Sequence, residues 1–445
     1  MNLAEVAAAV RARTVSPIEL VDQALDAADR FRHLNALAEV DADEARALAV
    51  RRTEEASSGR VRGALHGIPI TVKDVFVVHG FRLCAGTRAS LPPLGNQEAT
   101  AVRRLRDAGA IVFATTNMVE IALGIRGENP WTGDVRNPHD PRRQSGGSSS
   151  GSAVAVATGI GLASLGTDTG GSLRIPAGLC GVATIKPSIG AVPTDGVLPL
   201  SPTCDHVGPL ARSVTEVAYV LDVLIGRSPR SINAVAPRRV GVPRASLAGR
   251  LGLEVRAAFE ALLEQLRGSG VAVVNVEPVD LGLAEQAYAQ VVRPEAARIH
   301  RVALENSPES FSPGVRDALL VGRAMSDADY AEGRQLASRV RAGIDATLDD
   351  VDAMLLPATP VPAPLLGSAE VTVESGRMPH RDALIPLTLP FNLAGVPVAC
   401  LPFAWVDGLP VGLQVVAARG HDRRVMSHAR WLELFLTRGV LGTVA

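Results

Sequence analysis

Short apolar runs alternate with amphipathic stretches along most of the chain. The runs at 68–72, 110–115 and 271–276 have the length and the β-branched content of buried strands. Residues 99–108 and 254–267 place apolar side chains at helical spacing between them. Further strands are expected at 354–356, 396–401 and 413–416. This alternation predicts an α/β fold in which a large mixed, mainly parallel central sheet is covered by helices on both faces.

Two long parts of the chain, about 1–60 and 281–348, are nearly all helical in pattern. The first contains a capping box, Ser16 to Glu19 with proline at the first helical position, and is expected to wrap outside the core. No internal repeat or low-complexity linker interrupts the sequence, so we expect a single domain. Its parts are a helical wrap at 1–60, a core at 61–225, a helical cap or insertion at about 281–348, and the rest of the core at 350–445.

Composition and charge exclude several classes of protein. The chain has 445 residues, 47% of them hydrophobic, which is enough for a large core. A formal net charge of -1 argues against a nucleic-acid partner, because that class carries a clustered basic excess. The N-terminus lacks the basic leader of a signal peptide, and the run 153–166 is too short to span a bilayer. We therefore expect a cytoplasmic protein with no membrane partner.

The cysteines and histidines show no metal-binding spacing. The four cysteines lie far apart without a CxxC pair, and the nine histidines include no HExxH pattern. We expect reduced, structural thiols, no metal and no cofactor.

Lysine is almost absent from this sequence. Of the 45 Lys plus Arg residues, only Lys73 and Lys186 are lysines. A buried ammonium can lose its proton, whereas a guanidinium keeps its own at any usable pH. These two positions are therefore candidates for a role that arginine cannot fill.

A segment rich in glycine and serine, residues 144–190, stands out from the rest. It lies between apolar elements, where a flexible linker would not be placed. Adjacent glycines let backbone N–H groups approach a common point, which suits the stabilisation of a developing oxyanion. In Gly170-Gly171-Ser172 we therefore interpret Ser172 as a nucleophile and the neighbouring backbone N–H groups as an anion-binding site.

Three blocks of sequence resemble those of the amidase signature family. They are 67–74, which contains Lys73, 146–152, which contains Ser148, and 166–176, which contains Ser172. Lys73 lies 75 residues before Ser148, and Ser148 lies 24 before Ser172, as in that family. Secondary blocks at 116–118, 137–138, 205–210 and 409–414 agree. The resemblance is strong over about 60–220 and weaker in the C-terminal third.

The resemblance implies the amidase signature fold and a Ser–Ser–Lys triad. In that triad neutral Lys73 is the base, Ser148 relays the proton through its hydroxyl, and Ser172 attacks the carbonyl carbon. A cis Gly147–Ser148 peptide would hold Ser148 between the other two. Lys73 must then be buried enough to lower its pKa. The product of attack would be an acyl-enzyme that water hydrolyses.

The resemblance also implies roles for neighbouring residues. Backbone N–H groups of Thr169, Gly170, Gly171 and Ser172 would hold the oxyanion. Asp168, Arg174 and Ser149 would support the loop, and Lys186 would be structural. Where the family usually has glycine, this chain has Ser150, which would be strained if the position needs a positive φ.

The acyl pocket implied by the resemblance lies under 121–126 and under the helical region, with Ala122, Gly124 and Ile125 as contacts. These residues are apolar apart from Arg126, which favours an uncharged aryl or alkyl acyl group. Amides, anilides, esters and carbamates all present a carbonyl to the same serine, so the substrate stays open. We expect a small-molecule amide or carbamate, with water as second substrate, and a monomer or homodimer.

Other interpretations remain to be tested against the structure. Residues 147–151 also match the GxSxG elbow, with Ser149 as nucleophile and His206 or His66 as base, although turn residues rather than a strand precede it. Gly159 and Gly161 form a poor dinucleotide fingerprint. One group within the amidase signature family is the glutaminase subunit of a tRNA-dependent amidotransferase, which works with protein partners and is the alternative function.

Overall fold

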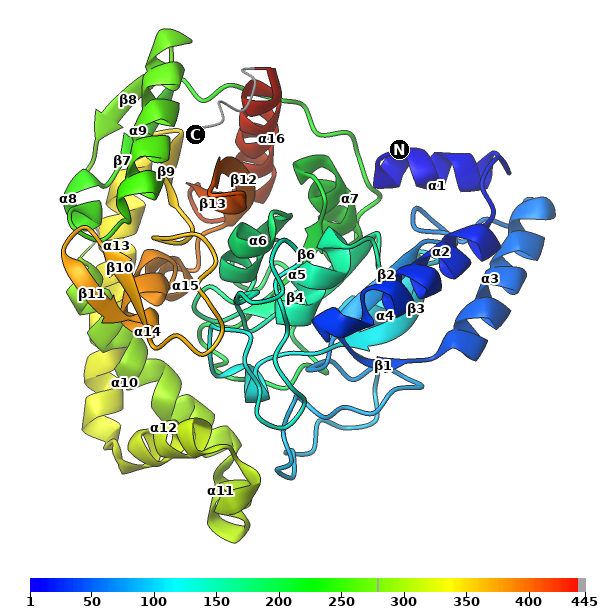
Figure 1. Ribbon diagram of the computed structural model, residues 1–445, viewed down its shortest axis with the longest axis horizontal. Helices are drawn as coiled ribbons and strands as arrows, with labels where there is room; N and C mark the ends of the chain where they lie inside the picture. The colour runs from blue at the N-terminus through cyan, green and yellow to red at the C-terminus, as the bar shows by residue number, and fades with distance from the viewer. Residues whose placement is uncertain (278–279, 439–445) are drawn as a thin grey trace.

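The computed structural model describes residues 1–277 and 280–438 (Figure 1). Its α-helices are α1 (Leu3–Arg11), α2 (Pro17–Arg30), α3 (Ala42–Ser57), α4 (Thr100–Asp107), α5 (Ser150–Ala157), α6 (Arg174–Cys180), α7 (Val214–Leu224), α8 (Arg244–Leu247), α9 (Leu253–Gly268), α10 (Leu281–Ile299), α11 (Arg301–Asn306), α12 (Pro313–Ala324), α13 (Asp327–Asp349), α14 (His380–Leu384), α15 (Pro390–Ala394) and α16 (Asp422–Arg438). Its strands are β1 (Leu37–Val40), β2 (Pro69–Lys73), β3 (Ile111–Thr116), β4 (Ala163–Asp168), β5 (Ala183–Lys186), β6 (His206–Ala211), β7 (Arg239–Val242), β8 (Ala272–Asn275), β9 (Ala353–Pro357), β10 (Glu370–Val373), β11 (Gly376–Pro379), β12 (Val398–Val406) and β13 (Leu409–Val416).

One mixed, 11-stranded sheet runs through the molecule in the order β1-β3-β2-β4-β6-β5-β12-β13-β9-β7-β8. Parallel pairs lie toward both flanks, where β3, β2 and β4 follow one another on one side and β9, β7 and β8 on the other. The strands between them, from β4 to β9, pair antiparallel. The predicted large mixed sheet in a single α/β domain is confirmed, with the parallel character concentrated where helices connect the strands.

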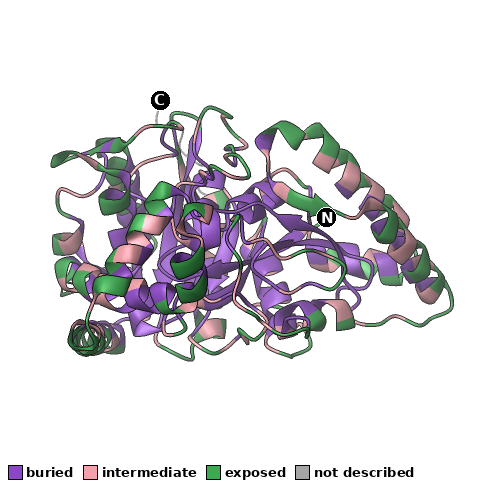
Figure 2. Cartoon of the chain, turned by 90° about the horizontal axis from the view of Figure 1, so that it is seen from below, coloured by how far each residue is buried: buried purple, intermediate pink, exposed green. Residues whose placement is uncertain are grey.

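Helices cover the sheet and leave its strands buried. Figure 2 shows a buried interior beneath helices whose outer faces are exposed. Every residue of β2, β3 and β4 is buried, including the polar residues at their carboxyl ends. The predicted capping box at Ser16 is present at the start of α2, with Pro17 at its first position. The predicted strands and helices named above all form, with ends shifted by one to a few residues.

Several strands were not predicted, namely β1, β4 to β7, β10 and β11. The edge strand β1, which pairs antiparallel with β3, lies within the N-terminal stretch expected to be helical. The β12–β13 hairpin was predicted only in part, and its turn residues Asp407 and Gly408 both have positive φ, 51° and 71°. Asp-Gly is the sequence that such a turn favours, so the signal was present in the chain.

The helical stretch predicted at about 281–348 forms α10 to α13, which Figure 1 places at the end of the molecule away from α1 to α3. None of the described helices has both the length and the apolar character that crossing a membrane would need.

Candidate active site

The three chemical blocks meet at one edge of the sheet. Strands β2 and β4 are parallel neighbours, so their carboxyl ends, Lys73 and Asp168, lie at the same edge. The loop after β4 carries Ser172 into α6, and the loop before α5 carries Ser148. Ligands of α/β sheets bind at such carboxyl ends. The fold therefore brings together residues that lie about 100 positions apart in sequence.

Lys73 is completely buried and contacts hydroxyl groups rather than carboxylates. Its Nζ donates to Ser148 Oγ at 2.8 Å and to Thr167 Oγ1 at 2.8 Å. Burial lowers the pKa of Lys73 to about 7, although the charges of Asp168 and Asp205 act in the opposite direction. A lysine in this state is unprotonated in a large fraction of molecules at neutral pH, which a general base requires.

Ser148 and Ser172 lie on the two loops that flank this lysine. The Gly147–Ser148 peptide bond is cis, as the resemblance implies. The backbone of the two loops is joined by a hydrogen bond from Ser149 N to Ser172 O at 3.1 Å. Within the described residues no hydrogen bond links the hydroxyls of Ser148 and Ser172. Catalytic hydrogen bonds are often open without substrate and tighten in the complex, so this geometry is compatible with a relay.

The N–H groups after β4 divide into two sets. That of Gly171 donates to Asp168 Oδ1 at 2.7 Å, so it is already engaged. Those of Thr169, Gly170 and Ser172 have no acceptor among the described residues and are free to hold an oxyanion. Gly171 adopts φ 130°, and a Cβ there would meet Thr388 Oγ1 at 2.3 Å, so only glycine fits. Three backbone N–H groups, rather than the four expected, are therefore available to an oxyanion.

A buried ion pair holds the loop. Asp168 and Arg174 are both fully buried, and the guanidinium donates to both carboxylate oxygens at 2.9 and 3.0 Å. Burial alone would raise the pKa of Asp168, but the Arg174 guanidinium and Asn392 hold it well below its usual range. Arg174 also donates to Thr388 O, Gln414 Oε1 and Asn392 Oδ1. These contacts give Asp168 and Arg174 a supporting position, as the resemblance implies.

Ser149, the nucleophile of the alternative GxSxG interpretation, is held by hydrogen bonds to the backbone of Thr167. Ser149 Oγ donates to Thr167 O at 3.0 Å and accepts from Thr167 N at 3.2 Å. The two candidate histidine bases of the GxSxG elbow make other contacts, His66 with Arg52 O and His206 with Lys186 and backbone carbonyls. No strand of the described chain directly precedes residue 147, so the elbow interpretation is wrong.

Two further predicted positions are explained by local structure. Ser150 is the first residue of α5 and does not have a positive φ, so the expected strain does not arise. Lys186 is fully buried and donates to the carbonyls of Pro187 and Val396, and burial lowers its pKa to about 7. Gly159 and Gly161 lie in the turn that joins α5 to β4. Neither glycine forms part of a nucleotide site there.

A cavity of about 430 Å³ opens onto Ser172. The predicted contacts Ala122, Gly124 and Ile125 line one wall. Ile121 and Ala122 have positive φ, 43° and 60°, a costly conformation for a β-branched residue such as isoleucine. The opposite walls come from α10, α12 and α14 and include Tyr288, Arg293, Ala318, His380 and Arg381.

The conformation of this loop is fixed by the carboxylate of Glu120. It accepts hydrogen bonds from Thr87 Oγ1, Trp131 Nε1 and the backbone N–H of Ser312. Since Ser312 is the N-cap of α12, the carboxylate joins the pocket loop to the helical layer.

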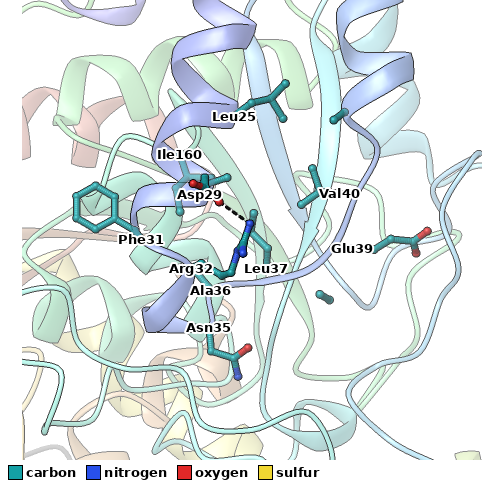
Figure 3. Close-up of a pocket in the computed structure, with 13 residues that line it drawn as sticks. Leu25, Asp29, Phe31, Arg32, Asn35, Ala36, Leu37, Glu39, Val40 and Ile160 are labelled. Carbon is teal, nitrogen blue, oxygen red and sulfur yellow. Dashed lines mark hydrogen bonds and ion pairs between the residues drawn. The ribbon is translucent and has the colours of Figure 1, made fainter.

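A second hollow, about 380 Å³, lies between α2 and the edge strand β1 (Figure 3). Its walls are largely apolar, and of its three charged residues Asp29 and Arg32 pair with each other, while Glu39 accepts a hydrogen bond from Arg82 N. It contains no residue of the proposed triad. Within the described chain no group of three or more His, Cys, Asp or Glu side chains is arranged to hold a metal ion.

Comparisons of sequence and structure relate this chain to known proteins. The amidase family model matches residues 19–426. The chain belongs to the amidase signature family. It is therefore a member of a family of hydrolases that act on carbon–nitrogen bonds.

Individual relatives cover nearly the whole chain. A crystal structure of an amidase superposes with a TM-score of 0.95 at 53% identity, covering 98% of this chain and 99% of that one. A glutamyl-tRNA(Gln) amidotransferase subunit of Halorhodospira halophila is 35% identical over 96% of this chain and 95% of its own length. AtzE, a 1-carboxybiuret hydrolase subunit of Pseudomonas sp. (strain ADP), is 36% identical over 84% of each chain.

Sequence reasoning placed the helical region over the pocket but named none of the residues that α10 and α14 bring to the cavity. Tyr288 packs its hydroxyl against Gly170, where a Cβ would lie 2.5 Å from it. Arg293 and Arg381 are two of many arginines, and nothing in their local sequence distinguishes them. Thr388 donates a hydrogen bond to Gly170 O, and nothing in its local sequence indicates this contact either.

We predict that Arg174→Met destabilises the protein by about 3–5 kcal/mol, because it leaves the buried Asp168 carboxylate without its counter-charge. Urea denaturation followed by circular dichroism would measure the loss. Arg142→Met, which removes an exposed arginine paired with Asp140, is the matched control and should leave the unfolding midpoint unchanged. Equal stability of the two variants would contradict the role given to the buried pair.

Proposed function

We propose that the protein is an acylamidohydrolase that works through a covalent acyl-enzyme on Ser172, with Ser148 as relay and Lys73 as base. The observation that carries this proposal is the hydrogen bond of a fully buried Lys73 to Ser148 Oγ, combined with a pKa lowered to about 7. A lysine that contacts hydroxyl groups and is partly deprotonated at neutral pH is suited to activating a serine.

The reaction follows from these positions. Neutral Lys73 takes the proton of Ser148, Ser148 takes that of Ser172, and Ser172 Oγ attacks the carbonyl carbon. The N–H groups of Thr169, Gly170 and Ser172 stabilise the resulting oxyanion. Collapse breaks the carbon–nitrogen bond, and the amine leaves with the proton returned through Ser148. Water, deprotonated by the same chain, then hydrolyses the ester on Ser172.

The proposed substrate is a small-molecule amide, with anilides, esters or carbamates (a urethanase activity) as further substrates. Each has a carbonyl of the size that the cavity admits next to Ser172. All four cysteines are free thiols, which supports a reducing compartment such as the cytoplasm.

A second candidate is the glutaminase subunit of a tRNA-dependent amidotransferase. Its support is the 35% identity with the Halorhodospira halophila protein over most of both chains. The higher identity, 53%, with a protein described as an amidase favours an independent hydrolase. Glutaminase activity that appears only with a second protein component would support the complex instead.

The first test is covalent labelling. A fluorophosphonate should modify Ser172, because this serine alone of the triad borders the cavity. Peptide mapping by mass spectrometry would locate the adduct, and Ser172→Ala should remove both the adduct and turnover. An adduct on Ser149 or Ser148 in the native protein would overturn the assignment.

Lys73→Arg should lower kcat/KM by at least about 10²-fold, the lower end of general base catalysis. Arginine keeps the charge but holds its proton at any usable pH, and its larger head crowds Ser148. Ser148→Ala should lose somewhat less, since a water molecule can occupy the relay position. Steady-state kinetics of both variants, with circular dichroism as a check of folding, would decide. Near-native activity of folded Lys73→Arg is incompatible with the triad.

The pH profile of kcat/KM should rise through about pH 7 and then level off. The base works only when unprotonated, so activity is present above the pKa of Lys73 and lost as the pH falls through it. Burial also raises the pKa of the Asp74 carboxyl to about 7, so Asp74→Asn is the control and should retain the limb. A rate independent of pH from 5 to 10, or a limb that disappears in Asp74→Asn, would exclude Lys73 as its source.

A further inference from the structure

The cavity at Ser172 has an uneven distribution of charge. No aspartate or glutamate lines it, whereas Arg126, Arg293, His380 and Arg381 do. The cavity therefore has cationic groups on its walls and no carboxylate of its own to balance them.

Two of these four groups, Arg126 and His380, already interact with other residues of the protein. Arg126 forms an ion pair with Glu128 at 2.7 Å. His380 contacts Gln144 through Nδ1 and Ser368 through Nε2, and burial lowers its pKa, which disfavours its charged form.

The other two arginines lie close enough to affect each other. Arg381 is exposed and interacts electrostatically with Glu285, but it forms no ion pair with any described residue. Arg293 is half-buried and has neither a hydrogen bond nor an ion pair to its guanidinium within the described chain. Burial lowers the pKa of Arg293, and the positive charge of Arg381 lowers it further.

This arrangement is unfavourable without an anion. A guanidinium that loses water without gaining a hydrogen bond is destabilised, and two guanidiniums close together repel each other. Elsewhere in the protein, buried arginines have partners, as Arg174 has Asp168 and Arg52 has Glu55. Arg293 is thus arranged for an anion that comes from outside the chain.

We infer that the substrate of Ser172 bears a carboxylate, which Arg293 binds with the help of Arg381 while the scissile amide lies at Ser172. This inference rests on the proposed amidohydrolase function and narrows its substrate class. The planar fork of a guanidinium matches a carboxylate in two parallel hydrogen bonds. Tyr288, one to two helical turns before Arg293 on α10, lines the same cavity and places its hydroxyl against Gly170. That hydroxyl has no hydrogen-bond partner among the described residues, so it is available to the same substrate.

The expectation of an uncharged acyl group came from residues 121–126 alone. That wall is indeed apolar, but the cationic wall is supplied by α10 and α14. A ligand with an alkyl middle and a carboxylate end fits both walls.

The test compares two matched series of substrates with the native enzyme. Monoamides of unbranched dicarboxylic acids, from succinic to adipic, are assayed against unbranched alkyl amides with equal numbers of carbons, by release of ammonia. We expect kcat/KM to be higher for the acids by about 10- to 100-fold, the range that charge-assisted hydrogen bonds supply. Equal or better hydrolysis of the alkyl amides would overturn the inference and leave the proposed function intact. If neither series reacts and Ser172 is not labelled, the proposed function itself fails.

A variant then locates the effect. Arg293→Gln should reduce the acid-to-alkyl ratio of kcat/KM by about 10- to 100-fold, and Arg381→Gln by a smaller factor, because that arginine is exposed. The matched control is Arg298→Gln on the same helix, where the arginine pairs with Asp327, stacks on Tyr330 and lies outside the cavity. It should leave the ratio unchanged. A ratio unaffected by folded Arg293→Gln would assign the preference to another group, and a ratio lowered equally by Arg298→Gln would show a general electrostatic effect; either result contradicts the inference.

Discussion

The ion pair of Asp168 and Arg174 is the interaction on which the site depends. Two fully buried charges are costly to desolvate, and they are tolerated only where every remaining donor and acceptor finds a partner. Here the partners come from α15, β13 and the segment before α15, through Asn392, Gln414 and Thr388. The same carboxylate accepts the N–H of Gly171 and Leu173, so it shapes the turn around Ser172. The position of Ser172, the proposed nucleophile, is thus set by a part of the chain more than 200 residues away.

Burial also explains why this chain uses lysine at all. Its two lysines are both fully buried, whereas the surface cations are arginines. Burial lowers the pKa of each to about 7, but their surroundings differ. Lys186 donates to backbone carbonyls that fix it in place, while Lys73 faces the hydroxyls of Ser148 and Thr167. The same physical effect gives one lysine a structural position and the other a position suited to proton transfer.

Features that depend on a few consecutive residues could be predicted from the sequence. The strand that ends at Lys73 and the glycine-serine blocks around Ser148 and Ser172 carry their information within a few residues, and the structure brings them together as neighbours. The engagement of Gly171 N–H by Asp168 could not be predicted, because it depends on loop geometry. The turn at Asp407 is different, since its Asp-Gly signal was present and was overlooked. Arg293 lies in an ordinary amphipathic helix, and only the packing of α10 across the cavity distinguishes it from other arginines.

These observations assign reaction and specificity to different layers of the fold. The sheet edge holds Lys73 and the loop of Ser172 by burial and hydrogen bonds. The helical layer lines the cavity with side chains from α10, α12 and α14. The two layers are joined by Glu120, whose carboxylate accepts from Trp131, in the segment between β3 and α5, and from Ser312 at the start of α12. Because that carboxylate is buried and fully bonded, the helical layer is held at a fixed distance from Ser172. Under the proposed function, substitutions on α10 and α14 therefore change the substrate accepted, while Lys73, Ser148 and Ser172 at the sheet edge carry out the same reaction.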